Sequence, residues 1–363
     1  MGKGLGLRVA PGHSPLRWGL LGTARINARL IQAVAMSERS VVTAVASRDG
    51  ARARSYANRH GIPLSFGNYE QMLASEEVDI VYVSLPNWLH VPWGVLVARS
   101  GKHALIEKPI AIHPGEMQRL MQAEEQNGVV IQEASMMRFH PQTALLRRMV
   151  SEGVIGVPRW AQATFGFTLL YADDIRLDAR GGGSMWDLGC YPITLFRAVL
   201  QARPEQVEGF IRRAGQPADM TFGAQILYGG GVMGQFVTSM EVFPSWSAEF
   251  VGSRGRIRVS YPWLSQVELS STVEVVTQEA SAAALSKSGD DNRAFGDEAD
   301  DRITRVHTFE GVNAYLEEVK AMERVILDGE PSIYPLGESA VNMATIRALL
   351  ESADHRKVVT VDG

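Results

Sequence analysis

The chain is poor in cysteine and has no long apolar run. Cys190 is the single cysteine among 363 residues, so no disulfide can form within the chain, which fits a reducing compartment. No stretch approaches the roughly 20 consecutive apolar residues that a membrane-spanning helix needs. Residues 1–15 lack the apolar segment of a secretory signal, and we expect a flexible tail there, native or left over from cloning. We therefore expect a cytoplasmic protein.

A surplus of positive charge is also missing. Lysine and arginine number 36 against 40 aspartate and glutamate, a formal net charge of −4, so the chain lacks the basic excess that neutralises nucleic-acid phosphates. We expect neither nucleic acid nor membrane as a partner. Of the residues, 45% are hydrophobic and 21% charged, which is enough to bury a large core and excludes a disordered chain. The length predicts two domains, since a domain usually takes about 100–200 residues.

The chain up to residue 138 alternates short apolar runs with amphipathic ones. The run 80–84 is almost wholly apolar, as expected of a strand that helices cover on both faces. Such alternation is typical of βαβ units and predicts a doubly wound parallel sheet, a Rossmann domain, over 16–138. The expected strands cover 16–22, 41–47, 80–84, 104–106 and 129–132, and the expected helices cover 25–36, 51–60, 91–100 and 114–127.

The pattern changes in the remainder, 139–363. Strand-like runs separated by glycine and proline predict an α+β domain with a large, open, mostly antiparallel sheet. Two helices, 312–327 and 338–353, are expected at the end, and the acidic segment 279–301 is expected to be a surface loop. The expected strands cover 160–167, 206–212, 221–227, 232–238, 248–251 and 267–276.

The junction between the first strand and the first helix predicts a phosphate-binding turn. A dinucleotide fingerprint would read G-x-G-x-x-G/A there, and this chain keeps Gly22 but has Ala24 and Asn27 at the other two positions. The N-terminus of the following helix offers free N–H groups and a positive dipole end to a diphosphate. We expect the cofactor to contact Gly22, Thr23, Ala24, Arg25 and Ile26. An ordinary strand–helix turn without a ligand is the alternative.

The end of the second strand bears on which cofactor binds. NAD-binding proteins usually place an acidic residue there for the ribose hydroxyls, and this chain has Ser47 and Arg48. Arg48, with Arg52 one turn further, can pair with a 2′-phosphate, and Ser47 can donate a hydrogen bond to it. Asp49 complicates the prediction, because its charge could soften the preference. We expect NADP, with NAD as the alternative.

Two further segments follow expected strands at the same edge of the sheet, where ligands of such sheets bind. Leu85, Pro86, Asn87 and His90 follow one strand, and Glu107 and Lys108 follow the next. His90 is expected to be structural or next to the cofactor. Much later, G-G-G-S-M-W-D-L-G-C-Y (181–191) begins an expected helix, on which Asp187 and Tyr191 share a face because they are four residues apart.

Two motifs, E-K-P at 107–109 and G-G-G…D-x-G-x-Y, carry a resemblance to a known family. The sequence resembles the Gfo/Idh/MocA family of oxidoreductases over nearly the whole chain. Ser47-Arg48, Arg138-Phe139-His140-Pro141 and the tyrosine of the last motif resemble one branch. That branch contains dihydrodiol dehydrogenase, NADP-dependent D-xylose dehydrogenase, glucose–fructose oxidoreductase and sugar ketoreductases. The resemblance implies Lys108, Asp187 and Tyr191 as catalytic residues, a cofactor contact from Arg138, and a cis peptide before Pro109. It also implies a homodimer or homotetramer that forms through the open sheet.

The chemistry of the three catalytic candidates is consistent with hydride transfer at a sugar carbon. Tyrosine is a weak base near neutrality, with an ordinary pKa of about 10, and we expect the Lys108 ammonium to lower the pKa of Tyr191 by ~1–3 units. Asp187 would orient Lys108 or a substrate hydroxyl. Arg176 and Trp186 are expected in the substrate cleft, and His140 as a substrate contact or a helix cap. Cys190 points off the shared face and is expected to be buried filler.

These features predict an NADP(H)-dependent oxidoreductase that acts on a sugar or cyclic polyol, with aldose oxidation at C1 as the first choice. Reduction of a keto-sugar or oxidation of a trans-dihydrodiol is the alternative within the same class. A non-catalytic NADP-sensing regulator is the alternative from another class, and a glycosidase that uses the cofactor in a redox cycle is less favoured. No metal site is expected.

Overall fold

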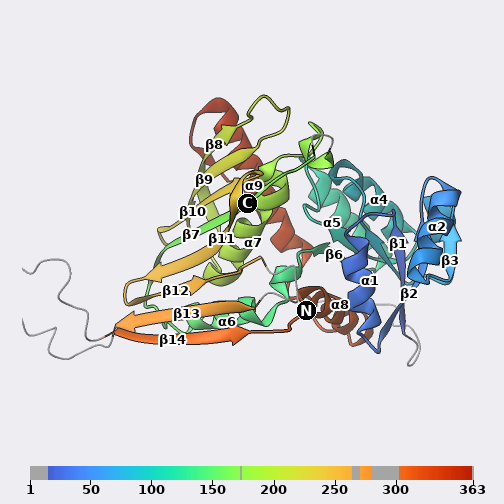
Figure 1. The fold of residues 1–363 in the computed structure, drawn as a ribbon, viewed down its shortest axis with the longest axis horizontal. Helices are drawn as coiled ribbons and strands as arrows, with labels where there is room; N and C mark the ends of the chain where they lie inside the picture. The colour runs from blue at the N-terminus through green and yellow to red at the C-terminus, as the bar shows by residue number, and fades with distance from the viewer. Residues whose placement is uncertain (1–14, 172–173, 264–269, 279–301, 362–363) are drawn as a thin grey trace, which may run out of the picture.

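The computed structural model describes residues 15–171, 174–263, 270–278 and 302–361. The expected tail, 1–15, lies outside these ranges except for Pro15, and the expected acidic loop, 279–301, lies outside them entirely. Figure 1 shows two bodies, a parallel α/β layer that contains β1 to β6 and a second, larger sheet beside it. No helix within the described ranges is long and apolar enough to cross a membrane.

The N-terminal sheet has six strands, all parallel, in the order β3-β2-β1-β4-β5-β6. This is the Rossmann order, in which successive strands are added on one side of β1 and then, from β4 onward, on the other side. The reversal leaves a crevice between β1 and β4 at the carboxyl ends of the strands. The expected doubly wound fold is confirmed. Its elements are β1 (Leu16–Leu21), α1 (Asn27–Ala35), β2 (Ser40–Ala46), α2 (Gly50–His60), β3 (Leu64–Phe66), α3 (Tyr69–Leu73), β4 (Ile80–Val83), α4 (Asn87–Arg99), β5 (His103–Glu107), α5 (Glu116–Asn127) and β6 (Ile131–Ala134).

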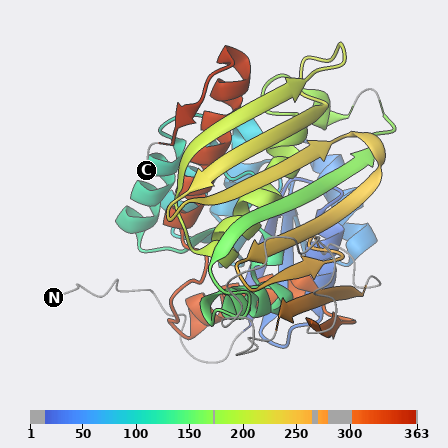
Figure 2. The ribbon, with the colours of Figure 1, turned by 90° about the vertical axis from the view of Figure 1, so that its left-hand side faces the viewer.

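The C-terminal sheet has nine strands in the order β14-β13-β12-β11-β7-β10-β9-β8-β15, and every pair is antiparallel except β7 with β10. Figure 2 looks onto one broad face of this sheet, while α7 and α9 lie between the sheet and the Rossmann layer in Figure 1. The strands are β7 (Pro158–Thr168), β8 (Pro204–Arg212), β9 (Thr221–Tyr228), β10 (Val232–Ser239), β11 (Glu241–Gly252), β12 (Gly255–Val259), β13 (Ser271–Gln278), β14 (Arg302–Phe309) and β15 (Val359–Thr360).

Four helices accompany the larger sheet, and one of them returns to the Rossmann layer. These are α6 (Pro141–Ser151), α7 (Cys190–Leu200), α8 (Ala314–Leu327) and α9 (Leu336–His355). Helix α8 lies beside α1 (Figure 1), and its Glu323 accepts hydrogen bonds from Ser37 and Ser40 at 2.5 and 2.6 Å. Its apolar side joins a core that includes Trp18 and Tyr82 of the parallel sheet. The Rossmann layer is therefore completed by a helix from the far end of the chain.

Several elements differ from the sequence expectation. Helix α4 begins at Asn87, four residues before the expected start, and contains Pro92 in its second turn. The short elements β3, α3, β12 and β15 were not expected, nor were α6 and β14. Strand β13 begins at Ser271, and the start of the strand expected over 267–276 lies partly outside the described residues.

Candidate active site

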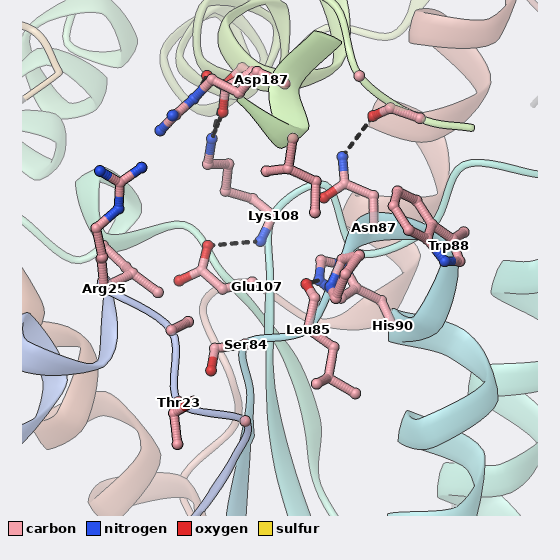
Figure 3. Close-up of a pocket in the computed structure, with 18 of the residues that line it drawn as sticks. Thr23, Arg25, Ser84, Leu85, Asn87, Trp88, His90, Glu107, Lys108 and Asp187 are labelled. Carbon is pink, nitrogen blue, oxygen red and sulfur yellow. Dashed lines mark hydrogen bonds and ion pairs between the residues drawn. The ribbon is translucent and has the colours of Figure 1, made fainter. Parts of the chain in front are cut away.

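A cavity of about 530 Å³ opens at the carboxyl ends of β1, β4 and β5, the crevice that the strand order creates. Figure 3 shows Lys108 between Glu107 and Asp187, with Arg25 on one side and Asn87, Trp88 and His90 on the other. The lining brings together most of the residues that the sequence singled out: Gly22, Thr23, Ala24, Arg25, Ile26, Ser47, Arg48, Arg52, Leu85, Pro86, Asn87, His90, Glu107, Lys108, Arg176, Asp187 and Tyr191.

The conformation of the turn after β1 depends on the backbone angle of Gly22 and on a hydrogen bond from Asn27. Gly22 has a φ of +103°, which disfavours any side chain, and a Cβ there would lie 3.1 Å from Leu85 Cδ2. Asn27 is fully buried and donates from Nδ2 to the carbonyl oxygen of Gly22 at 2.9 Å. The residue that replaces the third glycine of the fingerprint therefore fixes the turn, and no side chain caps α1. The N–H groups of Asn27, Ala28 and Arg29 donate to the backbone carbonyl oxygens of 24–26, so a diphosphate would meet the N–H groups of the turn that leads into the helix.

The end of β2 presents positive charge to the same cavity. Ser47, Arg48 and Arg52 all line it. Asp49, the complicating residue, caps α2: its carboxylate accepts from the N–H groups of Ala51 and Arg52 at 2.8 and 3.2 Å. Its negative charge therefore stabilises the N-terminus of α2, where the free N–H groups and the helix dipole favour a carboxylate.

The segment after β4 is fixed by side chains of that segment itself. His90 is fully buried, and its ring nitrogens lie 2.8 Å from the Pro109 carbonyl oxygen and 2.7 Å from that of Leu85. Burial lowers the pKa of His90. Through these two contacts, His90 joins the turn after β4 to the Lys108–Pro109 segment, whose peptide bond is cis. Asn87 donates to the Gly181 carbonyl oxygen at 2.7 Å and so joins this segment to the chain above the cavity.

Lys108 is anchored by Asp187. Its Nζ donates to Asp187 Oδ1 at 2.7 Å and to the Asp187 carbonyl oxygen at 2.8 Å. Burial alone would lower the pKa of Lys108, but Asp187 together with other neighbouring groups raises that pKa well above its ordinary value. Burial likewise would raise the pKa of Asp187, but Lys108 and Arg176 hold it below its ordinary value. Arg176 donates from Nε to Asp187 Oδ2 at 2.7 Å, so this carboxylate is shared by two cations.

Glu107 lies directly beneath this pair. It accepts from the Lys108 N–H at 3.2 Å and from the Tyr82 hydroxyl. Burial raises the pKa of Glu107, against the lowering effect of Lys108. Its side chain therefore holds the backbone of Lys108 in place at the end of β5.

The glycine run before Asp187 leaves room for a buried acid. Asp219 accepts from the Ser184 hydroxyl at 2.7 Å and from the Met185 N–H at 2.8 Å. Gly183 has a φ of +112°, and a Cβ there would lie 1.9 Å from Asp219 Oδ1. The chain then makes a π-helical turn, Met185–Gly189, before α7. Asp187 and Tyr191 lie in successive helical segments, not in one regular helix as expected, yet both line the cavity.

Tyr191 lies against aromatic neighbours. Its ring meets those of Phe165 and Trp263 edge-on, with centroids 5.2 and 6.0 Å away, and Lys108 Nζ lies 4.9 Å from its centroid. Burial raises the pKa of Tyr191, and the lowering effect of Lys108 does not outweigh it. The expectation of a net lowered pKa is therefore wrong, because desolvation of the phenolate exceeds the attraction of the ammonium. Tyr191 keeps its proton at neutral pH.

Three expected site residues lie outside this cavity. Arg138 ends a short turn after the edge strand β6, where its guanidinium lies 5.0 Å from the Tyr334 ring centroid and donates to the Ile333 carbonyl oxygen. Of the two roles considered for His140, the structure shows the cap: Nδ1 accepts from the Gln142 N–H at 3.1 Å. Trp186 lines a separate groove beside α5 and α9. Cys190 is buried, as expected.

Some lining residues had not been expected. Trp88 lies inside the motif after β4, and Tyr69 stands on the unexpected helix α3. Tyr315 reaches the cavity from the first turn of α8. Tyr315 lies near the motifs in the folded structure but more than a hundred residues after them in the sequence, so no sequence pattern around Tyr315 predicted its place in the cavity. Across the described residues, no three His, Cys, Asp or Glu side chains gather as metal ligands would.

Comparison with known proteins gives matches to both domains. Residues 16–135 match a family described as "Oxidoreductase family, NAD-binding Rossmann fold", and residues 143–258 match the GFO/IDH/MocA C-terminal domain. A D-xylose 1-dehydrogenase (NADP(+)) of Haloferax volcanii is 31% identical over 353 residues, 96% of this chain and 100% of that protein. The human trans-1,2-dihydrobenzene-1,2-diol dehydrogenase is 30% identical over 258 residues, 70% of this chain and 77% of that protein.

A solved structure has the same fold across both domains. It is KijD10, a 3-ketoreductase from Actinomadura kijaniata in complex with NADP and TDP-benzene, with a TM-score of 0.81 and 27% identity. The match covers 93% of this chain and 98% of that one.

Proposed function

Because the chain belongs to the Gfo/Idh/MocA family of NAD(P)-dependent oxidoreductases that act on CH–OH groups, we propose that it transfers hydride between NADP(H) and a sugar or cyclic polyol, with aldose oxidation at C1 as the first choice. The observation that carries the proposal is the single cavity in which the phosphate-binding turn, the end of β2 and the Lys108–Asp187–Tyr191 group meet. Similarity to the xylose dehydrogenase over its whole length supports the C1 choice.

The residues at the end of β2 fit the 2′-phosphate of NADP. Arg48 and Arg52 bring two guanidinium groups to the cavity, and Ser47 adds a hydroxyl. The carboxylate that follows Arg48 in sequence, Asp49, is bonded to the N-terminus of α2. Guanidinium groups bind phosphate through charge-assisted hydrogen bonds. Gly22 and the turn that leads into α1 fit the diphosphate. When bound, the nicotinamide supplies or accepts the hydride.

Replacing Arg48 tests the cofactor assignment. Loss of a charge-assisted phosphate contact costs about 1.5–3 kcal/mol, so Arg48→Ala is expected to weaken NADPH binding roughly 10- to 100-fold and to change NADH binding little. Fluorescence titration of the reduced cofactors measures both constants. Arg54→Ala, an exposed position on α2 outside the cavity, is the control. Equal losses for NADPH and NADH would contradict the assignment.

Tyr191 is the proton donor and acceptor in this proposal. Its hydroxyl gives a proton to the substrate oxygen when a carbonyl is reduced and takes one back when an alcohol is oxidised. Lys108, 4.9 Å from the ring centroid, stabilises the phenolate that forms, and Asp187 holds the ammonium in place. Burial raises the pKa of Tyr191, so the hydroxyl is protonated at neutral pH and is a weaker acid than a free phenol. Likeness to the 3-ketoreductase structure supports keto-sugar reduction as the second candidate, and similarity to the dihydrodiol dehydrogenase keeps trans-dihydrodiol oxidation as the third.

Tyr191→Phe tests the proton transfer. General acid–base catalysis is worth about 10²- to 10⁴-fold, so turnover is expected to fall at least 100-fold while NADPH binding is retained. Tyr228→Phe is the matched control, because that buried hydroxyl has no partner in the described structure and lies outside the cavity. Turnover of Tyr191→Phe within threefold of the parent would contradict the role. Aldoses and trans-dihydrodiols with NADP⁺, and keto-sugars with NADPH, form the substrate panel.

The same panel separates the enzyme from a non-catalytic NADP-sensing regulator. A regulator would bind NADPH without oxidising it, so the fluorescence of bound NADPH would not decay when keto-sugars are added. The anchored Lys108–Asp187 pair beside Tyr191 supports the enzyme, because binding alone does not require a proton-transfer group.

We further propose that the broad face of the nine-stranded sheet forms a homodimer or homotetramer interface. Phe210, Gly223 and Val237 are register neighbours on β8, β9 and β10, and Phe210 and Val237 are 60% and 48% exposed. A row of exposed apolar side chains on a sheet face is typical of an interface. Val237→Lys is expected to give a monomer in light scattering, whereas Val358→Lys, also exposed but near β15, is expected to leave the assembly intact.

A further inference from the structure

The segment 174–182, which we call the strap, crosses above the cavity and contains the same short motif twice. Asp174-Ile175-Arg176 and Asp178-Ala179-Arg180 both read D-x-R. In each, the aspartate accepts from the N–H of the arginine two residues later, at 3.0 and 2.9 Å, and also pairs with the guanidinium of that arginine. The two units are therefore locally equivalent.

Their surroundings differ. In the first unit the Asp174 side chain is only 4% exposed, and Arg176 lines the cavity. In the second unit the Arg180 side chain is 64% exposed, and its guanidinium lies 3.9 Å from the ring centroid of Trp88. The first unit faces the catalytic group, whereas the second holds the strap against α4 from outside.

The first unit extends the charge pairing of the active site. Lys108 and Arg176 each bond one oxygen of the Asp187 carboxylate at 2.7 Å. Arg176 also lies 3.2 Å from both oxygens of Asp174, and Arg25 of the phosphate-binding turn lies 3.6 Å from Asp174 on its other side. The two cations closest to the reacting end, Lys108 and Arg176, are thus balanced by Asp187 and Asp174, whereas the side chain of Arg25 is 85% exposed and its charge is largely screened by solvent. Without Asp174, Arg176 would add an unbalanced positive charge there.

We propose that Asp174 is a positioning and specificity residue: it fixes Arg176 against Asp187 and neutralises it, so that the site selects an uncharged polyhydroxy substrate over an anionic one. This inference rests on the proposed function for the class of substrate. Arg176 is a natural partner for a carboxylate or phosphate because its planar fork makes paired hydrogen bonds. Here Nε and Nη1 of that fork are already occupied by protein carboxylates.

Asp174→Asn tests the inference with little change of shape. Asparagine keeps the oxygen that accepts from the Arg176 N–H and removes the charge. Asp178→Asn is the matched control, because it makes the same change in the second unit. Asp174→Glu restores the charge. D-gluconate and D-sorbitol are the probes, since they share a carbon chain and differ in charge, and each is titrated into NADPH-loaded protein while the fluorescence of bound NADPH is followed.

In the parent, sorbitol is expected to bind at least as tightly as gluconate. In Asp174→Asn the preference for gluconate over sorbitol is expected to rise about fivefold, the effect of one unbalanced charge near the surface of a protein. Asp178→Asn and Asp174→Glu are expected to stay within twofold of the parent. An unchanged ratio in Asp174→Asn, the same change in Asp178→Asn, or no gluconate binding to Asp174→Asn would overturn the inference.

Turnover gives a second readout. With the best neutral substrate of the parent, kcat of Asp174→Asn is expected to fall about tenfold, with partial recovery in Asp174→Glu and less than a twofold change in Asp178→Asn. Failure of the proposed function would be seen separately, as a parent that turns over no member of the panel. The binding ratio would still decide the role of Asp174 in that case.

Discussion

Glu318 of α8 tests how a buried carboxyl group without a positively charged partner affects stability. Its side chain is 1% exposed, and within the described structure its Oε1 has no hydrogen-bond partner. Burial raises the pKa of Glu318 well above its ordinary value, and the nearby carboxylates of Glu107 and Glu133 raise it further. A carboxylate in this position would be unpaired and desolvated, so the group is protonated in the folded protein at pH values where it ionises in the unfolded chain.

The pH dependence of this effect has a definite sign. Because the folded-state pKa is raised, the favourable contribution is fully present below the pKa of the unfolded glutamate, about 4.3, and is lost as pH rises toward the folded-state pKa. Within that window the loss is about 1.4 kcal/mol per pH unit. Glu318→Gln keeps the shape of the protonated acid and cannot ionise. The variant is therefore expected to gain about 1.4 kcal/mol over the parent between pH 5 and pH 6.

Thermal unfolding at a series of pH values measures this gain. At roughly 2–4 °C per kcal/mol for chains of 150–250 residues, the difference in Tm between Glu318→Gln and the parent should widen by about 3 °C over that interval. Glu317→Gln is the control, because the neighbouring carboxylate is partly exposed and pairs with Lys320 at 2.8 Å. A difference in Tm that stays constant between pH 5 and pH 6 would refute the reasoning.

Two further variants test the active-site turn and the cap of α6. Gly183→Ala places a Cβ 1.9 Å from Asp219 Oδ1 and should lower the free energy of unfolding in urea by about 3 kcal/mol. Gly215→Ala is the control and should cost about 1 kcal/mol, because φ is also positive there but nothing lies within 4 Å. Equal costs would argue against the steric cause. Burial lowers the pKa of His140 to about 4, so the parent loses stability as pH falls below about 6.5. His140→Asn can still cap the helix and should lose about 2 kcal/mol less than the parent between pH 6.5 and 5, and a parallel loss would contradict this.

The sequence predicted those parts of the site that follow from strand order. The carboxyl ends of β1, β2, β4 and β5 meet at one edge of a parallel sheet, so the residues that follow them could be placed together from the sequence alone. These residues include Gly22, Ser47, Asn87 and Lys108. Asp187 joined them through the resemblance of its motif. Tyr315 could not be predicted, because it reaches the cavity only through the packing of α8 against the Rossmann layer.

Local patterns failed where burial or packing decides. The pKa of Tyr191 was expected to fall because Lys108 is near, but desolvation depends on neighbours such as Phe165 and Trp263, which come from distant strands. Strand β14 is mostly exposed or half-buried along its length, so it lacks the apolar signal of the other strands. It is held by eight register pairs with β13, an interaction that its own sequence does not display.

The return of α8 to the first sheet means that the nucleotide-binding half is not a self-sufficient piece of chain. A fragment that stopped at residue 138 would lack Val319 and Met322, and the surface around Trp18 and Tyr82 that these residues shield would meet water. The fragment would also lose Tyr315 from the cavity at the carboxyl ends of the strands. Exchange of such halves between relatives would therefore have to carry this late helix along with the early strands, as a unit assembled from two separate stretches of the gene.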